Sequence, residues 1–341
     1  YQAQDGGPLR TGVYKCDAKG KVTSISTEPG QNSAIFSGNF KQLMLTHHSA
    51  ATPPTYTLRN DKGKVQKTLQ DNAALKQKID GMNLAKIEFF QFQTQDGVDL
   101  NGIMVKPADF DANKKYPVIL YQYSGPGSQQ VLDSWYAGNC SAALLERYMA
   151  QEGFVSVIVD GRGTGGRGAE FEKQTYMKLG QLESHDQVET AIYLSKLPWV
   201  DAKHIGIWGW SFGGFNTLMS MSEGRPVFYA GVAVAPPTSW RYYDTVYTER
   251  FMRTPKENQE GYDCSPITRA KNLSGSLLII HGLADDNVHF RNVAEYTEAL
   301  VHADKDFRQL TYPNRNHSIY GGNTRNHLYR QLINHFKQSM K

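Results

Sequence analysis

Cysteine is scarce in this sequence, with three residues among 341. Cys16, Cys140 and Cys264 lie far apart and match none of the spacings with which cysteines bind zinc. At most one disulfide could join them. This excludes a disulfide framework as the source of stability and leaves the cellular compartment open.

Long hydrophobic runs and concentrated charge are also missing. No apolar stretch reaches the length of about 20 residues that a membrane-spanning helix needs. The formal net charge is +4 and no lysine or arginine run concentrates it, so nucleic acid is not indicated as a partner. The chain begins with Tyr1 and has no signal-peptide pattern, so we expect a processed protein or an excised piece. Its length suits one large domain and part of another.

A nucleophile-elbow pattern stands at the centre of the sequence. Gly-Trp-Ser-Phe-Gly at residues 209–213 follows an apolar strand-like run and precedes a helix-like one, with Ser211 at the apex. The glycines permit a tight reversal that holds a serine in a strained turn with its hydroxyl exposed. The amides that open the helix face the point where negative charge develops during acyl transfer. A serine in an ordinary glycine-rich turn is the alternative, and the flanking strand and helix disfavour it.

The start of the chain is predicted to be all-β. Asp-Ala-Lys-Gly-Lys-Val at residues 17–22 recurs as Asn-Asp-Lys-Gly-Lys-Val at residues 60–65, with Gly20 and Gly63 43 residues apart. Each Lys-Gly suits a positive-φ hairpin turn, and a repeat of about 40–45 residues is typical of a propeller blade. Because one blade cannot close a propeller, we expect residues 1–75 to be the remnant of a propeller-like domain and residues 76–341 a second domain.

Past a polar connector at residues 71–83, the pattern changes to alternating strands and helices. A hairpin is expected from residues 87–92 and 98–105, around an Asp-Gly turn. Ser184 and Gln187 form a capping-box start for the second of the later helices. Strands are expected at residues 116–123, 154–159, 205–208, 231–235, 277–280 and 307–312, and helices at 142–151, 187–196, 212–221 and 293–302. This predicts an α/β-hydrolase: a mostly parallel central sheet flanked by helices, with an antiparallel edge.

Ser211 needs a general base, and the base needs a carboxylate to fix its tautomer. In this fold the acid and then the histidine follow the nucleophile, each on a loop at the carboxyl end of a later strand. One such loop carries Asp285 and Asp286, and the next carries His317. Spacing does not separate the two aspartates, and either could cap the helix that begins near His289. The other histidines precede the serine or the acid, or lie in or beside helices.

A second glycine pattern offers a different function. Gly-Arg-Gly-Thr-Gly-Gly at residues 161–166 satisfies the dinucleotide fingerprint, with Glu183 near the place of a ribose-binding acid. No firm amphipathic helix is predicted directly behind these glycines, and the preceding strand is not the first of the sheet. We therefore interpret the segment as a loop across the top of the sheet and expect no cofactor.

Several longer stretches occur together with the elbow. They are Ser-Gly-Pro-Gly-Ser-Gln at residues 124–129, Asp-Gly-Arg-Gly-Thr-Gly at 160–165, Trp-Arg-Tyr-Tyr-Asp at 240–244, Tyr-Thr-Glu-Arg at 247–250 and His-Gly-Leu-Ala-Asp-Asp-Asn-Val-His-Phe at 281–290. With them the chain resembles the prolyl oligopeptidase family of serine peptidases, from about residue 85 to the end and more weakly at the β-rich start.

The resemblance implies roles for individual residues. Ser211 is the nucleophile, His317 the general base and Asp285 the orienting acid. The Tyr123 hydroxyl and the Phe212 amide form the oxyanion hole. Asn287 holds the carbonyl between the first two substrate residues. A proline-accepting pocket is lined, beside Phe212, by Trp240, Tyr243, Tyr247 and Val288. On composition alone, these aromatic residues would be plain core. No metal or cofactor is implied.

The implied activity is that of a serine exopeptidase that releases N-terminal dipeptides with proline, or less well alanine, in the second position. Alternatives are a tripeptidyl or acylaminoacyl peptidase, an esterase, a truncated and weakly active hydrolase module, or a non-catalytic binding fold. Phe212 stands where many relatives have tyrosine, and Pro237 also departs, so both are expected to alter the pocket. The family's glutamate pair for the substrate N-terminus lies on propeller segments outside these residues. The relatives also imply a homodimer and export.

Overall fold

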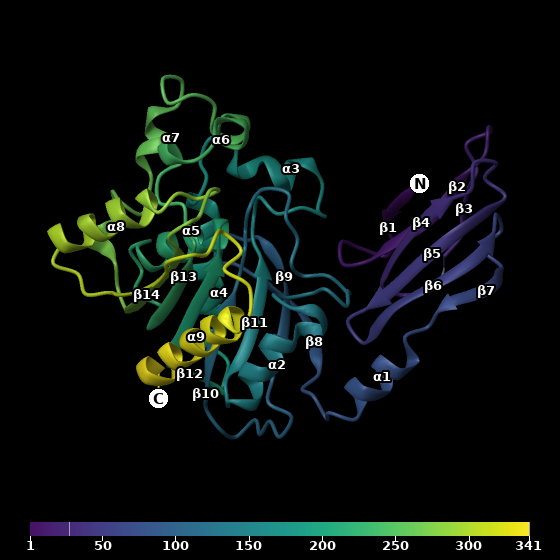
Figure 1. The fold of residues 1–341 in the computed structure, drawn as a ribbon, viewed down its shortest axis with the longest axis horizontal. Helices are drawn as coiled ribbons and strands as arrows, with labels where there is room; N and C mark the ends of the chain where they lie inside the picture. Colours follow the sequence, from purple (N-terminus) through teal and green to yellow (C-terminus); the bar gives the residue numbers. More distant parts are fainter. Residues whose placement is uncertain (27, 341) are drawn as a thin grey trace.

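The computed structural model describes residues 1–26 and 28–340. Two small antiparallel sheets open the chain, on one side of the molecule (Figure 1). Val13, Ile25, Leu43 and Leu45 are buried between them. The first sheet contains β1 (Gln2–Gln4), β2 (Thr11–Cys16) and β3 (Val22–Ser24); the second contains β4 (Gln31–Phe36), β5 (Gln42–Ser49), β6 (Thr52–Asn60) and β7 (Val65–Gln70).

The hairpins β2–β3 and β6–β7 have the same turn. Gly20 has φ 82° and Gly63 has φ 81°, the left-handed conformation in which glycine has no steric penalty. Asp17 and Asn60 each accept, through one side-chain oxygen, the backbone N–H groups two and four residues later. The sequence repeat is therefore a structural repeat of the hairpin turn. The second sheet is a complete four-stranded unit.

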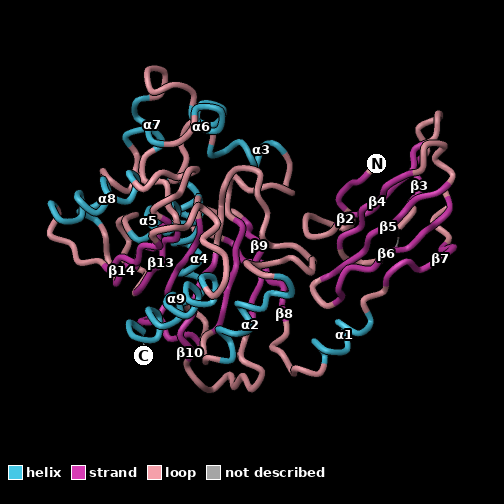
Figure 2. The backbone as a smooth tube through the Cα atoms, viewed as in Figure 1, coloured by secondary structure: helices cyan, strands magenta, loops and turns pink. Residues whose placement is uncertain are grey.

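A connector and the large sheet follow. Helix α1 (Ala73–Asp80) buries none of its residues, and the expected boundary between residues 75 and 76 falls inside it. Figures 1 and 2 show α1 between the small sheets and the rest of the chain. The large sheet has the order β15-β14-β13-β12-β10-β11-β9-β8. Its strands are β8 (Ile87–Gln93), β9 (Asp99–Val105), β10 (Tyr116–Tyr121), β11 (Val155–Asp160), β12 (Val200–Trp210), β13 (Ala230–Val234), β14 (Ser276–Gly282) and β15 (Arg308–Tyr312).

The strands from β10 to β15 are parallel, and the β8–β9 hairpin forms an antiparallel edge, as the sequence predicts. Both faces are covered by helices, which explains the continuously apolar strands. One core cluster contains residues of α4 (Gln181–Ser195), α5 (Phe212–Met221) and α8 (Arg291–His302); the other contains residues of α2 (Leu144–Gln151) and α9 (Thr324–Met340). The expected α/β-hydrolase plan is confirmed.

One helix start predicted from the sequence is wrong. Helix α4 begins at Gln181, and its capping box pairs Gly180 with Glu183 rather than Ser184 with Gln187. Ser184 lies inside the helix, where its hydroxyl donates to the Gly180 carbonyl at 2.6 Å. Gly180 has a φ of 91°, which a helix does not use, and its N–H donates to Glu183 Oε2 at 2.9 Å. Tertiary packing requires the glycine, because a Cβ at residue 180 would lie 2.6 Å from the Phe215 ring.

Short helices complete the structure, and Figure 1 shows α3, α6 and α7 above the large sheet. They are η1 (Ser141–Ala143), α3 (Ala169–Glu172), η2 (Lys173–Thr175), η3 (Trp240–Tyr242), α6 (Thr245–Met252), α7 (Gln259–Asp263) and η4 (Ala270–Asn272). All three cysteines are free. Within residues 1–26 and 28–340, no helix combines the length and the apolar character required to cross a bilayer.

Hydrogen bonds join the β-rich start to the large sheet. One Asp133 carboxylate oxygen accepts the Ala50 N–H at 3.1 Å, and the other accepts the Arg10 Nε–H at 2.9 Å. The Trp135 N–H donates to His48 Nδ1 at 3.2 Å. Burial lowers the pKa of His48, which favours the neutral imidazole that can accept this bond.

Candidate active site

Ser211 occupies a strained elbow between β12 and α5. Its φ of 59° and ψ of −118° lie outside the regions that side chains favour. The turn is tight enough that a Cβ at Gly209 would lie 2.4 Å from the Gly213 carbonyl oxygen. Below it, the buried Gln122 donates from Nε2 to that same carbonyl at 2.7 Å. The strand-turn-helix context predicted from the sequence is present.

His317 and Asp285 come together with Ser211 from loops that follow β15 and β14. His317 Nε2 lies 2.9 Å from the Ser211 Oγ, and His317 Nδ1 lies 2.8 Å from Asp285 Oδ2. With Nδ1 protonated, the ring donates to Asp285 and can accept the serine proton at Nε2. The geometry is that of a nucleophile, a base and an orienting acid in series.

The structure separates the two aspartates that spacing left open. Asp285 is 5% exposed, whereas Asp286 is exposed. Asp285 Oδ1 accepts the N–H groups of Asn287 and Val288 at 3.0 and 2.9 Å. Burial opposes the charged carboxylate, but the hydrogen bond and charge of His317 and these two amides outweigh it and lower the pKa of Asp285. Neither aspartate caps α8, whose N-cap is Phe290.

A second histidine, His281, lies against Asp285. His281 is fully buried, and its Nε2 lies 2.8 Å from the Val288 carbonyl and 3.4 Å from Asp285 Oδ2. Burial lowers the pKa of His281, which favours a neutral ring with its Nε2 proton donated to these oxygens. Its place before the acid in sequence agrees with a supporting role rather than that of the base.

Tyr123 packs against Phe212, the first residue of α5, which follows Ser211 directly. The rings of Tyr123 and Phe212 are 6.1 Å apart. The Tyr123 hydroxyl has no hydrogen-bond partner among the described residues, and partial burial raises the pKa of this phenol. A neutral phenol with a free O–H, beside the first amide of a helix, can donate to a developing oxyanion.

The predicted pocket residues form an aromatic cluster beside the elbow. Trp240 lies 5.5 Å from Phe212 and 6.0 Å from both Tyr243 and Tyr247, measured between ring centroids. The Tyr243 hydroxyl donates to Asn287 Oδ1 at 2.8 Å. This bond connects the aromatic cluster with the loop that carries Asp285. Val288 is fully buried, and its backbone binds Asp285 and His281.

The rival glycine loop has a structural explanation. Arg162 is buried and binds Asp186 through Nε at 3.0 Å and Asp96 through a terminal nitrogen at 2.9 Å. Glu183, the candidate ribose acid, is fully buried at the start of α4 and accepts the Gly180 N–H. Neither residue is free for a dinucleotide. Among the described residues, no group of three or more His, Cys, Asp or Glu side chains is arranged to hold a metal ion.

Sequence reasoning missed two residues that hold the histidine loop. Trp210, next to the nucleophile, donates its indole N–H to the His317 carbonyl at 3.0 Å. The Arg325 guanidinium lies 4.7 Å from the Trp210 ring centroid and donates to the Ser318 carbonyl. Because Trp210 lies more than 100 residues from both His317 and Arg325, no local pattern could have indicated its contacts.

Comparisons with known proteins agree with this geometry. A family model described as the prolyl oligopeptidase family matches residues 142–341. The crystal structure of Porphyromonas gingivalis dipeptidyl peptidase 4 aligns with a TM-score of 0.96 and 49% identity, covering 99% of this chain and 48% of that one.

Two fungal proteins are also similar. A probable dipeptidyl peptidase 4 of Aspergillus flavus is 38% identical over 275 residues, which is 79% of this chain and 35% of that protein. A probable dipeptidyl-aminopeptidase B of Pyrenophora teres is 36% identical over 342 residues, or 97% and 37% of the two chains. The chain therefore spans between about a third and a half of the length of these relatives. Since the family model matches more than half of its residues, the chain belongs to the prolyl oligopeptidase family of serine peptidases.

Proposed function

We propose that this chain carries the catalytic machinery of a dipeptidyl peptidase, which releases N-terminal dipeptides with proline or alanine in the second position. The observation that carries the proposal is the hydrogen-bonded series Ser211–His317–Asp285, at 2.9 and 2.8 Å, set in a strained elbow. The names of the similar proteins support the dipeptidyl specificity.

In acylation, the Ser211 Oγ attacks the carbonyl carbon of the second substrate residue while its proton passes to His317 Nε2. Asp285 stabilises the imidazolium through Nδ1–H. The Ser211–carbonyl bond forms, the carbonyl π electrons move onto oxygen, and the intermediate then collapses with proton transfer from His317 to the departing amine. Water, deprotonated by His317, hydrolyses the resulting ester and frees the dipeptide.

We assign the oxyanion hole to the Tyr123 hydroxyl and the Phe212 amide. Tyr123 packs against Phe212, which follows Ser211 directly, and a free phenol O–H is a strong neutral donor. One such donor is worth about 3–4 kcal/mol in the transition state when it is preorganised. Phe212 serves twice, because its amide faces the oxyanion while its ring joins the pocket wall.

The aromatic cluster is proposed to select the second substrate residue. Phe212 and Trp240 are buried, whereas Tyr243 and Tyr247 are partly exposed and pack against them. We propose that the partly exposed rings contact a rigid pyrrolidine, which loses little rotamer freedom on binding, whereas a charged side chain would be desolvated there without a partner. The Asn287 side chain accepts a hydrogen bond from the Tyr243 hydroxyl, and we propose that its N–H donates to the substrate carbonyl between the first two residues.

Residues that recognise a free substrate N-terminus are not among the candidate site residues of this chain. In the proposed division, residues 1–75 belong to a propeller-like domain and residues 76–341 to the catalytic one. These residues can therefore form a working triad without the residues that restrict cleavage to substrates with a free N-terminus. We infer that dipeptide selectivity belongs to the longer protein, and that cleavage after proline belongs to this part.

The test is hydrolysis of Gly-Pro and Ala-Pro p-nitroanilides, with free and acetylated N-termini, by the parent chain and by Ser211→Ala. The matched control is Ser195→Ala, at the far end of α4, which should retain activity. We expect parental cleavage, loss in Ser211→Ala, and comparable rates for blocked and free substrates.

Each result has a distinct reading. If acetylation of the substrate N-terminus abolished cleavage, this chain by itself would select substrates with a free N-terminus. Cleavage of simple esters but not of the anilides would favour an esterase. A folded parent that neither hydrolyses these substrates nor reacts with a fluorophosphonate would refute an assembled triad.

A further inference from the structure

An open cavity of about 460 Å³ lies where the β-rich start, the connector and the large sheet meet. Its walls come from the turn between β5 and β6, from α1 and residues 83–87, and from Trp135 and α2. None of its lining residues belongs to the candidate active site. The cavity is therefore a separate feature of the junction.

Arg147 on α2 lines this cavity, and its guanidinium has no carboxylate partner among the described residues. The residue is 8% exposed, and its Nε is buried without a hydrogen-bond partner. Arg147 forms no side-chain ion pair, hydrogen bond or ring contact with another residue of the described ranges. Burial lowers the pKa of Arg147, and no nearby carboxylate opposes this effect. Its terminal nitrogens also lack a protein partner but are not fully buried, and guanidinium groups are normally paired with carboxylates or phosphates.

The remaining walls of the cavity indicate the kind of anion. Lys76 is already paired with Asp80, at 2.7 Å, so Lys86 is the other cation of the lining without a carboxylate partner among the described residues. Leu84 and Trp135 add apolar surface. One guanidinium fork suits the two oxygens of a carboxylate, whereas a phosphate presents more oxygens than these cations could satisfy.

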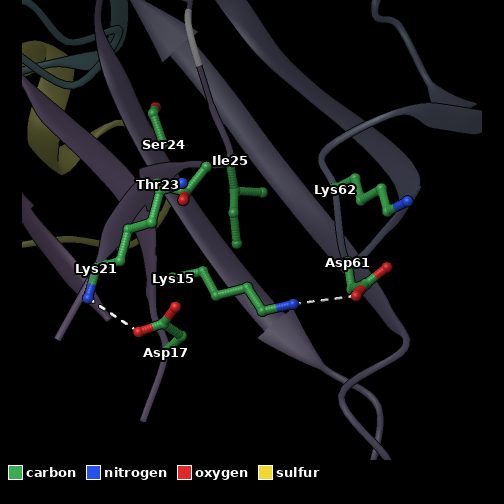
Figure 3. Close-up of a pocket in the computed structure, with 8 residues that line it drawn as sticks. All are labelled: Lys15, Asp17, Lys21, Thr23, Ser24, Ile25, Asp61 and Lys62. Atoms are coloured by element: carbon green, nitrogen blue, oxygen red, sulfur yellow. Dashed lines mark hydrogen bonds and ion pairs between the residues drawn. The ribbon is translucent and has the colours of Figure 1, made fainter. Parts of the chain in front are cut away.

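A second cavity, between the β2–β3 hairpin and the β6–β7 turn, provides a contrast (Figure 3). It is also lined by lysines, but aspartates stand among them. Lys15 pairs with Asp61 at 3.1 Å, and the Lys21 N–H donates to Asp17 at 2.9 Å. Lys15 has a carboxylate partner there, and Lys15, Asp17 and Lys21 are exposed to solvent. No charged side chain of this cavity is buried, so none requires a ligand.

We propose that the junction cavity binds a carboxylate carried on an apolar body. The carboxylate pairs with the Arg147 guanidinium, and the apolar part packs against Trp135 and Leu84. Because the walls come from three segments of the chain, an occupied site fixes the β-rich start and α1 against the large sheet.

The experiment is isothermal titration of the 341-residue chain with sodium 3-phenylpropanoate, at an ionic strength of about 0.15 M so that weak surface pairing is screened. Arg147→Leu is expected to weaken binding by about tenfold or more, since a charge-assisted hydrogen-bonded pair is lost. Arg147→Lys should retain part of the affinity, and the exposed control Arg330→Leu on α9 should bind like the parent.

Thermal denaturation without ligand provides a second readout that does not depend on peptidase activity. If the guanidinium is unpaired, Arg147→Leu should unfold at the parental temperature or above, because it removes a polar group whose Nε is buried without a hydrogen-bond partner. A clear fall in its unfolding temperature would mean that Arg147 already has a partner within the chain, and would overturn the proposal.

Two further probes decide the class of ligand. Equal affinity for neutral 3-phenylpropanamide would refute anion recognition, and tighter binding of inorganic phosphate would refute the choice of a carboxylate. Acetyl-leucyl-phenylalanine offers the same carboxylate on a peptide, so its affinity relative to 3-phenylpropanoate identifies whether a peptide or a small acid is the better source.

Discussion

Replacing Trp210 by phenylalanine should slow acylation while leaving the fold intact. The change keeps an aromatic ring under the Arg325 guanidinium but removes the indole N–H that donates to the His317 carbonyl at 3.0 Å. A neutral hydrogen bond contributes about 1 kcal/mol net, which corresponds to about fivefold in rate if it is lost wholly from the productive geometry. Larger losses follow if the loop shifts, since about 1 Å of misplacement can cost about 100-fold.

Two assays measure this effect independently. kcat/KM for Ala-Pro p-nitroanilide and the rate of fluorophosphonate labelling should fall by the same factor, because both depend on proton transfer from Ser211 to His317. KM should change less than kcat. Trp199→Phe is the matched control, since Trp199 packs against Phe110 away from the elbow, and it should stay within about twofold of the parent.

Arg325 is a second residue that holds the His317 loop. It donates to the Ser318 carbonyl and also to the Tyr329 hydroxyl at 3.3 Å, so it holds the same loop from α9. Arg325→Gln combined with Trp210→Phe should lose less than the product of the two single losses, as coupled residues do. Parental labelling and kcat/KM in a folded Trp210→Phe variant would refute the assignment of this bond to positioning His317.

Two other predictions concern carboxyl groups. Asp285→Asn should lower kcat by about 10⁴-fold because an amide favours the wrong His317 tautomer, whereas exposed Asp286→Asn should keep parental p-nitroanilide kinetics; equal losses would contradict the assignment. Burial raises the pKa of Glu146 from 4.5 to about 7, so the folded chain keeps a proton that the unfolded chain releases between these values. The free energy of unfolding should therefore fall by about 3 kcal/mol as pH rises through this interval, and denaturant titrations of Glu146→Gln should lack this fall.

The elbow and the order of its partners could be predicted because each depends on a local pattern. An apolar strand, a tight glycine turn and a helix occupy consecutive residues around Ser211. The loops that carry Asp285 and His317 follow strands of the same parallel sheet, whose carboxyl ends meet at one edge. The repeated hairpin turns at Gly20 and Gly63 could be predicted for the same reason, because the positive φ of a turn glycine depends on a few adjacent residues.

The start of α4 could not be predicted in the same way. Ser184 and Gln187 satisfy a capping pattern, yet the helix extends past them to Gly180, where the Phe215 ring leaves no room for a Cβ. A local signal was present, and a contact with a residue of α5 overrode it. Tyr123 is a similar case, since it lies beyond the end of β10 and composition alone indicates only a core aromatic.

The choice between Asp285 and Asp286 shows what decides such a site. Asp285 divides its two oxygens: Oδ1 accepts amides of its own loop, and Oδ2 faces His317 from another loop. The bonds to Oδ1 come from the Asn287 and Val288 amides of the same loop, so they orient the carboxylate without any contact to His317. The bond to Oδ2 requires the β14 and β15 loops to meet, with Trp210 holding the His317 carbonyl in place. Spacing therefore identifies a loop with a suitable acid, and only the packed sheet determines which oxygen can orient the base.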